Sequence, residues 1–294
     1  MPILLEGKTL SRMILDALPG RIAKLTAGAG RAPLLAIVNY FDDSASGIYV
    51  KRKVSACDKL GIQVRLIKPE QREGLAGFLK ILGDLKDDPG VDAVMVERPL
   101  PDGFEVPLMW DAVPAAKDVD ALSSMNMGRL FISKAADIGT AGFFVPCTAL
   151  AVVRLLKYHG IDVKSKKVAV AGRSTVVGRP LAHMLTNLEA TVTVCHTKTP
   201  AIEAVFKASD IVVTAAGKAR WLKAGMLAPG ATVIDVGTNI DDAGKMCGDA
   251  DFEDIKDTVK AITPVPGGVG PVTMACLIEA SVTAAENRGR RAVG

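Results

Sequence analysis

The sequence predicts a two-domain α/β fold, with an N-terminal α/β substrate domain and a Rossmann-like nucleotide-binding domain. Its 294 residues are more than one hydrophobic core usually holds. Short apolar runs alternate with stretches of helical spacing, and a glycine turn joins one such run to a helix. We expect residues 1–142 and 272–294 to form the first, catalytic domain and residues 143–271 to form the nucleotide domain. The last helix is expected to pack back on the first domain.

Strands and helices alternate along the first half of the chain. Apolar spacing over residues 10–25 predicts a helix that Pro19 kinks or breaks. The predicted parallel strands are residues 34–38, 63–67 and 92–96. The predicted helices between them are residues 44–60, with residues 42–44 as capping candidates, and residues 75–85. Residues 113–142 are expected to form a loop.

The second half continues the alternation. A connecting helix is predicted over residues 148–158 and a final helix over residues 274–287. Strands are predicted at residues 168–171, 191–194, 210–214 and 231–235, with a helix over residues 180–188. Residues 262–271 form a loop rich in proline and glycine, whereas a simple linker would be polar and flexible.

Composition excludes several classes of protein. No apolar run approaches the ~20 residues of a membrane span, and the N-terminus lacks the plan of a signal peptide. The five cysteines are scattered without a C-x-x-C pair, which indicates reduced thiols in the cytoplasm. Basic residues are spread along the chain and only 4% of residues are aromatic, so nucleic acid is not an expected partner. His183 and His196 have no second ligand at metal spacing, so no metal site is expected.

The glycine turn after residues 168–171 is a candidate phosphate site. A strand, a glycine turn and a helix start aim free backbone N–H groups and the positive end of a helix dipole at one point. Gly172 and Gly178 bracket five residues, without the middle glycine of G-x-G-x-x-G. The pattern alone therefore leaves a purely structural turn as an alternative.

The next predicted strand favours NADP over NAD. About twenty residues after the glycine turn, an NAD-binding fold places an acidic residue that binds the ribose 2′-hydroxyl. This chain has Cys195-His-Thr197-Lys198-Thr there, and Arg173 adds a second cation within the turn. Two cations and no carboxylate suit a 2′-phosphate. The alternative is an ordinary basic surface loop.

Three features of the first half could carry chemistry. Tyr49 and Lys53 lie four residues apart on a predicted helix, so a phenol and an ammonium share one face and could position a substrate and move protons. The alternative is a solvated basic face. Glu97 follows the third strand, where open α/β sheets bind ligands, or belongs to an exposed ion pair. Asp118 and Asp120 could bind an amide or amino group, or cap a turn.

Several of these patterns belong to an ordered series of motifs. They are Tyr49-x-x-x-Lys53, Pro99-Leu-Pro101, Lys117-Asp-Val-Asp120, Pro146-Cys-Thr148, Gly172-Arg-Ser174, Val177-Gly-Arg-Pro180, Cys195-His-Thr-Lys-Thr199, Asp235-Val-Gly237 and Pro264-Val-Pro-Gly-Gly-Val-Gly-Pro271. With them the chain resembles, over nearly its full length, the bifunctional methylenetetrahydrofolate dehydrogenase/methenyltetrahydrofolate cyclohydrolase family.

The resemblance implies a cytoplasmic homodimer that binds tetrahydrofolate one-carbon derivatives in a cleft between two domains. Such an enzyme oxidises 5,10-methylenetetrahydrofolate by hydride transfer to NADP. Bifunctional members then hydrolyse the 5,10-methenyl product to 10-formyltetrahydrofolate. The catalytic positions correspond to Lys53, Tyr49, Glu97 and Asp120. The substrate-binding positions correspond to Tyr49, Lys53, Asp120, Pro264, Gly267 and Gly268. The cofactor-binding positions correspond to Gly172, Arg173, Ser174, Gly178, Thr197, Lys198 and Thr238.

Three departures from the family pattern lie close to the chemistry. The family has Val-Gln-Leu-Pro-Leu-Pro where this chain has Val-Glu97-Arg-Pro-Leu-Pro, so a carboxylate replaces the amide that partners the lysine. After Asp120, Ala-Leu-Ser-Ser replaces Gly-Phe-His-Pro, which could weaken or shift pterin binding. Ala149 replaces a proline at a helix start.

The carboxylate bears on the hydrolytic step. A carboxylate beside Lys53 favours the ammonium form, which allows hydride transfer but removes a proton from attacking water poorly. A fully bifunctional enzyme and a dehydrogenase with weak or absent cyclohydrolase activity both stay open, and Glu97 could itself act as the base.

Two other functions stay open as alternatives. One is a catalytically silent folate or nucleotide sensor, against which the retained Lys53 speaks. The other is a two-domain dehydrogenase of another small substrate, such as the shikimate dehydrogenase type. The loop at residues 264–271 and the Tyr49–Lys53 pair favour folate.

Overall fold

The computed structural model describes residues 2–41, 45–105, 109–134 and 142–291, and the chain divides into two compact units. Unit 1 comprises Met1–Arg12, Leu130–Ala141 and Pro146–Cys276. Unit 2 comprises Met13–Arg129, Gly142–Val145 and Leu277–Gly294.

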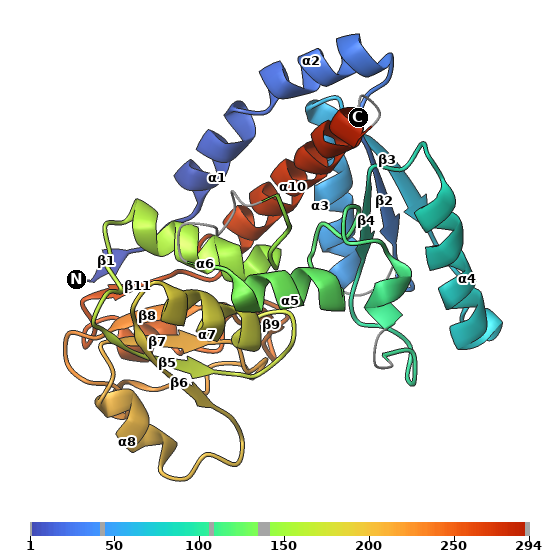
Figure 1. Ribbon diagram of the computed structural model, residues 1–294. Helices are drawn as coiled ribbons and strands as arrows, with labels where there is room; N and C mark the ends of the chain where they lie inside the picture. Colours follow the sequence, from blue (N-terminus) through green and yellow to red (C-terminus); the bar gives the residue numbers. More distant parts are fainter. Residues whose placement is uncertain (1, 42–44, 106–108, 135–141, 292–294) are drawn as a thin grey trace. The chain divides into compact units, whose positions relative to one another are not determined.

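Unit 1 is built on a six-stranded parallel sheet in the order β1-β11-β8-β7-β5-β6 (Figure 1). The strands are β1 Ile3–Leu4, β5 Lys167–Ala171, β6 Thr191–Cys195, β7 Ile211–Thr214, β8 Thr232–Asp235 and β11 Ala261–Ile262. Strands β5, β7 and β8 are buried almost throughout, which is why the centre of each strand is apolar. The unit also contains α6 Cys147–Tyr158, α7 Gly178–Asn187, α8 Ile202–Lys207, α9 Phe252–Ile255 and the hairpin of β9 Asn239–Ile240 with β10 Met246–Cys247.

The order of the strands reverses at β5. The chain goes from β5 to β6 on one side and then to β7 on the other side of β5. Parallel strands end at the same edge of a sheet, and open α/β sheets bind ligands at that edge, where the order reverses. The glycine turn after β5, the loop after β6 and the segment after β7 therefore share the expected cofactor edge.

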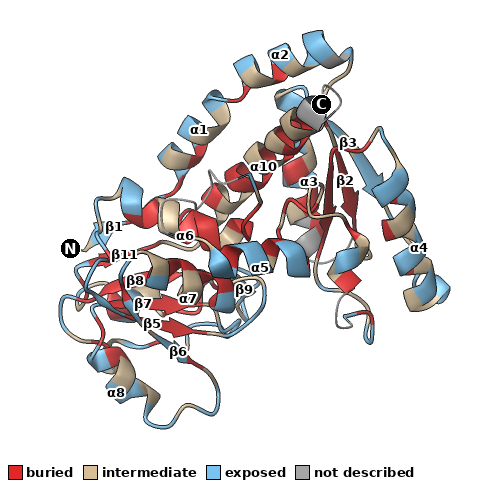
Figure 2. Cartoon of the chain, in the orientation of Figure 1, coloured by how far each residue is buried: buried red, intermediate tan, exposed pale blue. Residues whose placement is uncertain are grey.

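Unit 2 contains a three-stranded parallel sheet in the order β3-β2-β4. The strands are β2 Leu34–Val38, β3 Gln63–Ile67 and β4 Ala93–Val96, connected by α3 Ala45–Lys59 and α4 Gly74–Asp87. Figure 2 shows β2 and β4 buried and β3 largely exposed. Phe78 and Leu82 of α4 are fully buried and pack in one cluster with residues of β2 and β4.

The last helix, α10 Val269–Arg291, packs on an element from the start of the chain, α2 Pro19–Ala29. Arg21 of α2 donates hydrogen bonds from Nε and Nη2 to the two carboxylate oxygens of Glu286, at 2.9 and 2.8 Å. It also donates to Oγ1 of Thr283 at 2.8 Å. The predicted return of the last helix to the first half of the chain is confirmed.

The structure matches most predicted elements and corrects one. The helix predicted over residues 10–25 is two helices, α1 Lys8–Asp16 and α2, because Pro19 begins the second one, where its missing N–H costs no hydrogen bond. The loop predicted over residues 113–142 is wrong, since α5 Ser124–Ile132 lies within it. Asp111 holds the start of α5 by accepting bonds from the backbone N–H and the hydroxyl of Ser124, at 2.7 and 2.8 Å. Because this cap lies thirteen residues before the helix, the residues next to Ser124 give no sign that a helix begins there.

The capping candidates at residues 42–44 lie outside the described residues. The predicted domain boundaries stay a prediction. Contacts assign residues 1–12 to unit 1 because β1 pairs with β11. None of the described helices has both the length and the apolar character needed to cross a membrane.

Candidate active site

The centre of the candidate site in unit 2 is a buried ion pair. Nζ of Lys53 lies 2.6 Å from Oε2 of Glu97, and each residue is only 8% exposed. Lys53 projects from α3, and Glu97 directly follows β4, held by a bond from its N–H to the carbonyl of Val38 at 2.8 Å. Glu97 is therefore not part of an exposed pair at a strand end. The structure brings together the two residues that the sequence comparison places at the chemistry.

The side chains around this ion pair differ in what they can do. Tyr49 is half-buried and lies one helical turn before Lys53 on α3. Cys57, one turn after Lys53, is fully buried, and burial raises the pKa of its thiol to about 12. A thiol with such a pKa stays protonated and unreactive at neutral pH. Cys57 therefore contributes to the packing of the core and is not a nucleophile.

The segment Lys117-Asp-Val-Asp120 contains two structural residues. The ammonium of Lys117 donates to the carbonyls of Leu85, Lys86 and Asp88 at the end of α4, at 3.0, 2.9 and 2.7 Å. Burial lowers its pKa. The buried carboxylate of Asp118 accepts from the N–H groups of Leu122 and Ser123, at 3.1 and 2.8 Å, and from Nδ2 of Asn126 at 3.1 Å. For Asp118 the turn-capping alternative is correct.

Asp120 has a different position from Asp118. The backbone at Asp118 pairs in parallel with Val94 of β4, so this segment runs toward the same edge of the small sheet as β4. Glu97 comes three residues after Val94, and Asp120 comes two residues after Asp118. Asp120 is half-buried. It is the aspartate of this segment that remains a candidate ligand of substrate.

In unit 1, the two glycines of the turn after β5 are packed too closely for a side chain at either position. Gly172 has a φ of +129°, and a Cβ there would lie 2.3 Å from the carbonyl oxygen of Ala215. A Cβ at Gly178 would lie 2.0 Å from the carbonyl oxygen of Gly172. Oγ of Ser174 accepts from the N–H of Val177 at 3.1 Å and of Gly178 at 3.5 Å, at the start of α7. Only glycine fits at these two positions, and the turn that they allow leads into the start of α7, the end of a helix that favours phosphate.

The predicted cofactor side chains surround that edge of the sheet. Arg173 and Ser174 are exposed in the turn, Thr197 and Lys198 are exposed in the loop after β6, and Thr238 is exposed shortly after β8. The loop after β6 is held by His196, whose N–H donates to Oγ1 of Thr199 at 2.8 Å and whose Nδ1 accepts from the N–H of Lys198 at 3.1 Å. Both cations predicted for a 2′-phosphate thus point to solvent at the cofactor edge.

The loop that begins at Pro264 is also in unit 1 and is tightly folded. The N–H of Gly268 donates to the carbonyl of Pro264 at 2.8 Å, and the N–H of Gly7 donates to the carbonyl of Gly267 at 2.8 Å. A Cβ at Gly7 would lie 2.0 Å from the carbonyl oxygen of Gly268. The segment is therefore a fixed loop, as its proline and glycine content predicts, but it ends before residue 271 because α10 already begins at Val269.

Two buried aspartates of unit 1 are not among the site residues predicted from the sequence. Asp235 ends β8 and Asp249 follows β10. Asp235 belongs to a recognised motif, but Asp249 stands in no pattern that would single it out. Among the described residues, no group of three or more His, Cys, Asp or Glu side chains is arranged to hold a metal ion. The five cysteines are all buried, and none of them forms a disulfide within the described part of the chain.

The fold and these two sets of residues define a class: a dinucleotide-binding α/β protein with a second α/β unit that carries a buried lysine. The family comparison is specific. Residues 5–120 match the catalytic domain of tetrahydrofolate dehydrogenase/cyclohydrolase, and residues 146–289 match its NAD(P)-binding domain. The chain belongs to this family.

Relatives match along their whole length. Bifunctional protein FolD of Elusimicrobium minutum is 42% identical over 287 residues, which are 97% of this chain and 100% of the relative. The crystal structure of the bifunctional FolD of Campylobacter jejuni has a TM-score of 0.90 at 37% identity and covers 98% of this chain and 100% of that chain. The Trypanosoma brucei enzyme, solved with NADP cofactor and an inhibitor, has a TM-score of 0.88 at 31% identity, over 97% of this chain and 98% of that chain.

Proposed function

We propose that this protein oxidises 5,10-methylenetetrahydrofolate to 5,10-methenyltetrahydrofolate with NADP, and then hydrolyses the product to 10-formyltetrahydrofolate. The observation that carries the proposal is the buried Lys53, held by Glu97, in a unit that matches the family's catalytic domain. Burying two charges costs several kcal/mol per ion, so stability alone does not explain the buried Lys53–Glu97 pair, and a functional role does. Full-length FolD relatives support both steps.

The proposed roles follow the chemistry of each side chain. Lys53 faces the reacting one-carbon bridge, Tyr49 lines the pterin beside it, and Asp120 accepts hydrogen bonds from the pterin's amino edge. Glu97 accepts a hydrogen bond from Lys53 and orients it. Pro264, Gly267 and Gly268 border the folate with a loop that is already fixed, so that binding loses little conformational freedom. Residues 1–142 with 272–294, and residues 143–271, remain the proposed domains.

The residues at the cofactor edge fit NADP, which supplies the hydride acceptor when bound. Gly172 and Gly178 permit the tight turn that would bind the pyrophosphate, and Ser174 holds the turn in place. Arg173 and Lys198 provide two cations for the 2′-phosphate, with Thr197 and Thr238 as hydroxyl donors. The absence of a carboxylate in the loop after β6 removes the group that would repel a phosphate.

A spectrophotometric assay tests this function and the cofactor preference together. NADPH formation with methylenetetrahydrofolate is expected to exceed NADH formation. Replacing Arg173 or Lys198 with serine should raise the KM for NADP by about tenfold and leave the KM for NAD unchanged, because only NADP carries the 2′-phosphate. Lys166→Ser, at the opposite end of β5, is the matched control and should change neither value. Equal losses with both cofactors would contradict the assigned role.

The silent-sensor alternative makes a different prediction in the same assay. It expects NADP and folate to bind without NADPH formation. The buried Lys53, paired with Glu97, speaks against it, because a binding protein has no need for this lysine. A dehydrogenase of another small substrate is not favoured, since the catalytic-domain match covers residues 5–120.

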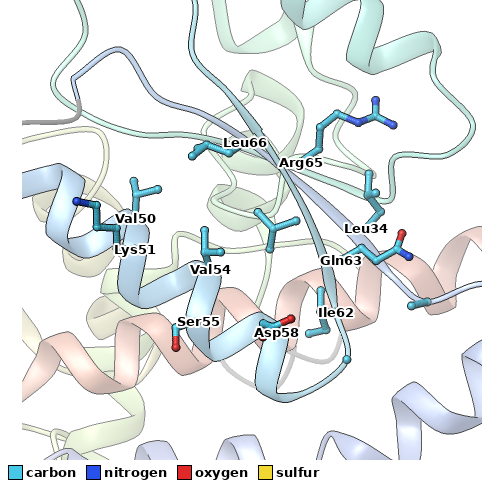
Figure 3. Close-up of a pocket in the computed structure, with 13 residues that line it drawn as sticks. Leu34, Val50, Lys51, Val54, Ser55, Asp58, Ile62, Gln63, Arg65 and Leu66 are labelled. Atoms are coloured by element: carbon cyan, nitrogen blue, oxygen red, sulfur yellow. The ribbon is translucent and has the colours of Figure 1, made fainter.

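We further propose that the protein is a homodimer that pairs through a groove between α3 and β3 (Figure 3). The groove has a volume of about 910 Å³. β3 pairs with β2 on one side, and no partner lies on its other side among the described residues. Lys51 and Asp58 lie two turns apart on α3 along this groove, so a twofold axis could place each opposite the other in a second copy.

Sedimentation velocity tests the dimer. Leu66, on β3, lines the groove and is 38% exposed. Leu66→Lys should weaken the dimer by tenfold or more, because it places two like charges in a desolvated interface. Leu79→Lys is the control, since Leu79 on α4 is 36% exposed and does not line the groove. A wild-type monomer at micromolar concentration would contradict the proposal.

We propose the cytoplasm as the compartment. The support is chemical: the five cysteines are buried, no disulfide joins any two of them among the described residues, and reduced thiols suit a reducing environment.

A further inference from the structure

Asp235 and Asp249 are buried almost completely, at 3% and 0% exposure. A buried carboxylate is costly unless hydrogen bonds replace its water. The Lys53 chemistry of unit 2 does not use either residue, so their presence in unit 1 requires a separate explanation.

Asp249 joins two segments that follow different strands. Its Oδ2 accepts from the N–H groups of Ala216 and Gly217, at 2.6 and 3.2 Å. Its Oδ1 accepts from the N–H of Lys218 and from Nδ2 of Asn239, both at 2.9 Å. One carboxylate therefore holds the segment after β7 and the segment after β8 together.

Asp235 anchors the same region from the end of β8. Its Oδ1 accepts from the N–H groups of Gly237 and Asp249, at 2.9 and 3.0 Å, and from the hydroxyl of Thr214 at 3.1 Å. Its Oδ2 accepts from the N–H of Ala250 at 2.8 Å. The backbone of Asp249 is thus itself positioned by Asp235.

The packing around both carboxylates excludes side chains. A Cβ at Gly248 would lie 1.8 Å from Oδ2 of Asp235, and a Cβ at Gly237 would lie 2.2 Å from Oδ1 of Asp249. Burial raises the pKa of Asp235 to about 6, and the charge of Asp249 adds to that rise. The carboxylates of Asp235 and Asp249 are therefore close together and buried. The backbone N–H groups that donate to them offset the cost of burying these two like charges.

The two segments lie at the cofactor edge of the sheet. Gly172 approaches Ala215 so closely that a Cβ there would be 2.3 Å from the carbonyl oxygen of Ala215. Residues 216–218 directly follow Ala215 and therefore lie next to the glycine turn, at the point where the strand order reverses. Thr238 stands between Gly237 and Asn239, and each of these two neighbours is bonded to one of the aspartates.

We propose that Asp235 and Asp249 form a carboxylate clamp that fixes residues 215–218 and 237–239 in the geometry that binds NADP. The inference rests on the proposed function, because it assumes NADP as the ligand. Both aspartates are positioning residues: they act through backbone N–H groups and Asn239 rather than by touching the cofactor.

The test compares amide variants whose expected losses differ. In Asp249→Asn, the new NH₂ group faces two donors in either orientation, so we expect the Kd for NADP to rise about tenfold or more. In Asp235→Asn, an NH₂ group at the Oδ2 position faces only the N–H of Ala250, so we expect about a threefold rise. The kcat should change less than the KM for NADP. Hydrogen exchange of residues 216–218 should accelerate in Asp249→Asn.

Asp210→Asn is the matched control. Asp210 also accepts a backbone bond, from the N–H of Lys167 at 2.8 Å, but at the opposite edge of the sheet. This variant should bind NADP as the wild type does. If Asp249→Asn does not fold, Asn239→Ala removes one donor and leaves the carboxylate in place, with an expected threefold rise in Kd.

Two results would overturn the clamp. One is an unchanged NADP Kd in folded Asp249→Asn, with exchange at residues 216–218 accelerated. The other, if that variant does not fold, is an unchanged Kd in Asn239→Ala. Failure of the wild type to bind NADP, measured by calorimetry, would instead refute the proposed function. The exchange experiment would still show whether the aspartates hold these segments.

Discussion

Lys53→Met is expected to reduce hydrolysis of methenyltetrahydrofolate by about 10²-fold or more, because general acid–base groups contribute on that scale. It should also destabilise the protein. Removing one partner of a buried ion pair leaves the other charge unpaired, which costs about 3–5 kcal/mol. In this chain the unpaired group is Glu97, which is 8% exposed. Hydrolysis rates and urea unfolding measure the two effects separately.

The double variant Lys53→Met with Glu97→Gln separates catalysis from stability. It removes both charges, so most of the lost stability should return while hydrolysis stays lost. If the double variant hydrolysed methenyltetrahydrofolate at the wild-type rate, Lys53 would have no catalytic role.

Glu97→Gln alone addresses the departure from the family pattern. The variant restores the amide of the family pattern beside Lys53, so hydrolysis should increase by about tenfold while NADP reduction changes little. A loss of hydrolysis in this variant would show instead that Glu97 is the base. Hydrolysis by the wild type no faster than the spontaneous reaction would reduce the proposed function to the dehydrogenase step.

Gly178→Ala is expected to abolish NADP binding at millimolar cofactor. The new Cβ would lie 2.0 Å from the carbonyl oxygen of Gly172, whereas real Cβ contacts stay beyond 3.0 Å. The obstacle is backbone, so the glycine turn itself must open and its N–H groups would no longer converge on a phosphate. Calorimetry with NADP measures the effect.

Gly225→Ala provides the control in the same unit, because a Cβ there meets no atom within 4 Å. Its NADP affinity should equal that of the wild type. Circular dichroism should show that Gly178→Ala keeps its helices, because alanine is a better helix former than glycine. An unchanged Kd in Gly178→Ala would mean that the cofactor does not use this turn.

Local pattern was sufficient for most of the fold. The run Leu34–Val38 is a strand with the predicted bounds, since a buried parallel strand requires continuous apolar residues. The glycine turn was placed correctly because only glycine fits where backbone approaches backbone this closely. Helix α5 was missed because its cap, Asp111, lies far from it in sequence.

The sequence by itself determined the α/β class and the family, and it predicted the residues of the candidate site, because these depend on local periodicity and on motifs of adjacent residues. Only the tertiary structure decided what the carboxylates do. It paired Glu97 with Lys53 across 44 positions, and it joined Asp235 and Asp249 to backbone groups from three separate segments. Hydrogen bonds between distant segments form only after the chain has folded, so no local pattern in the sequence records them.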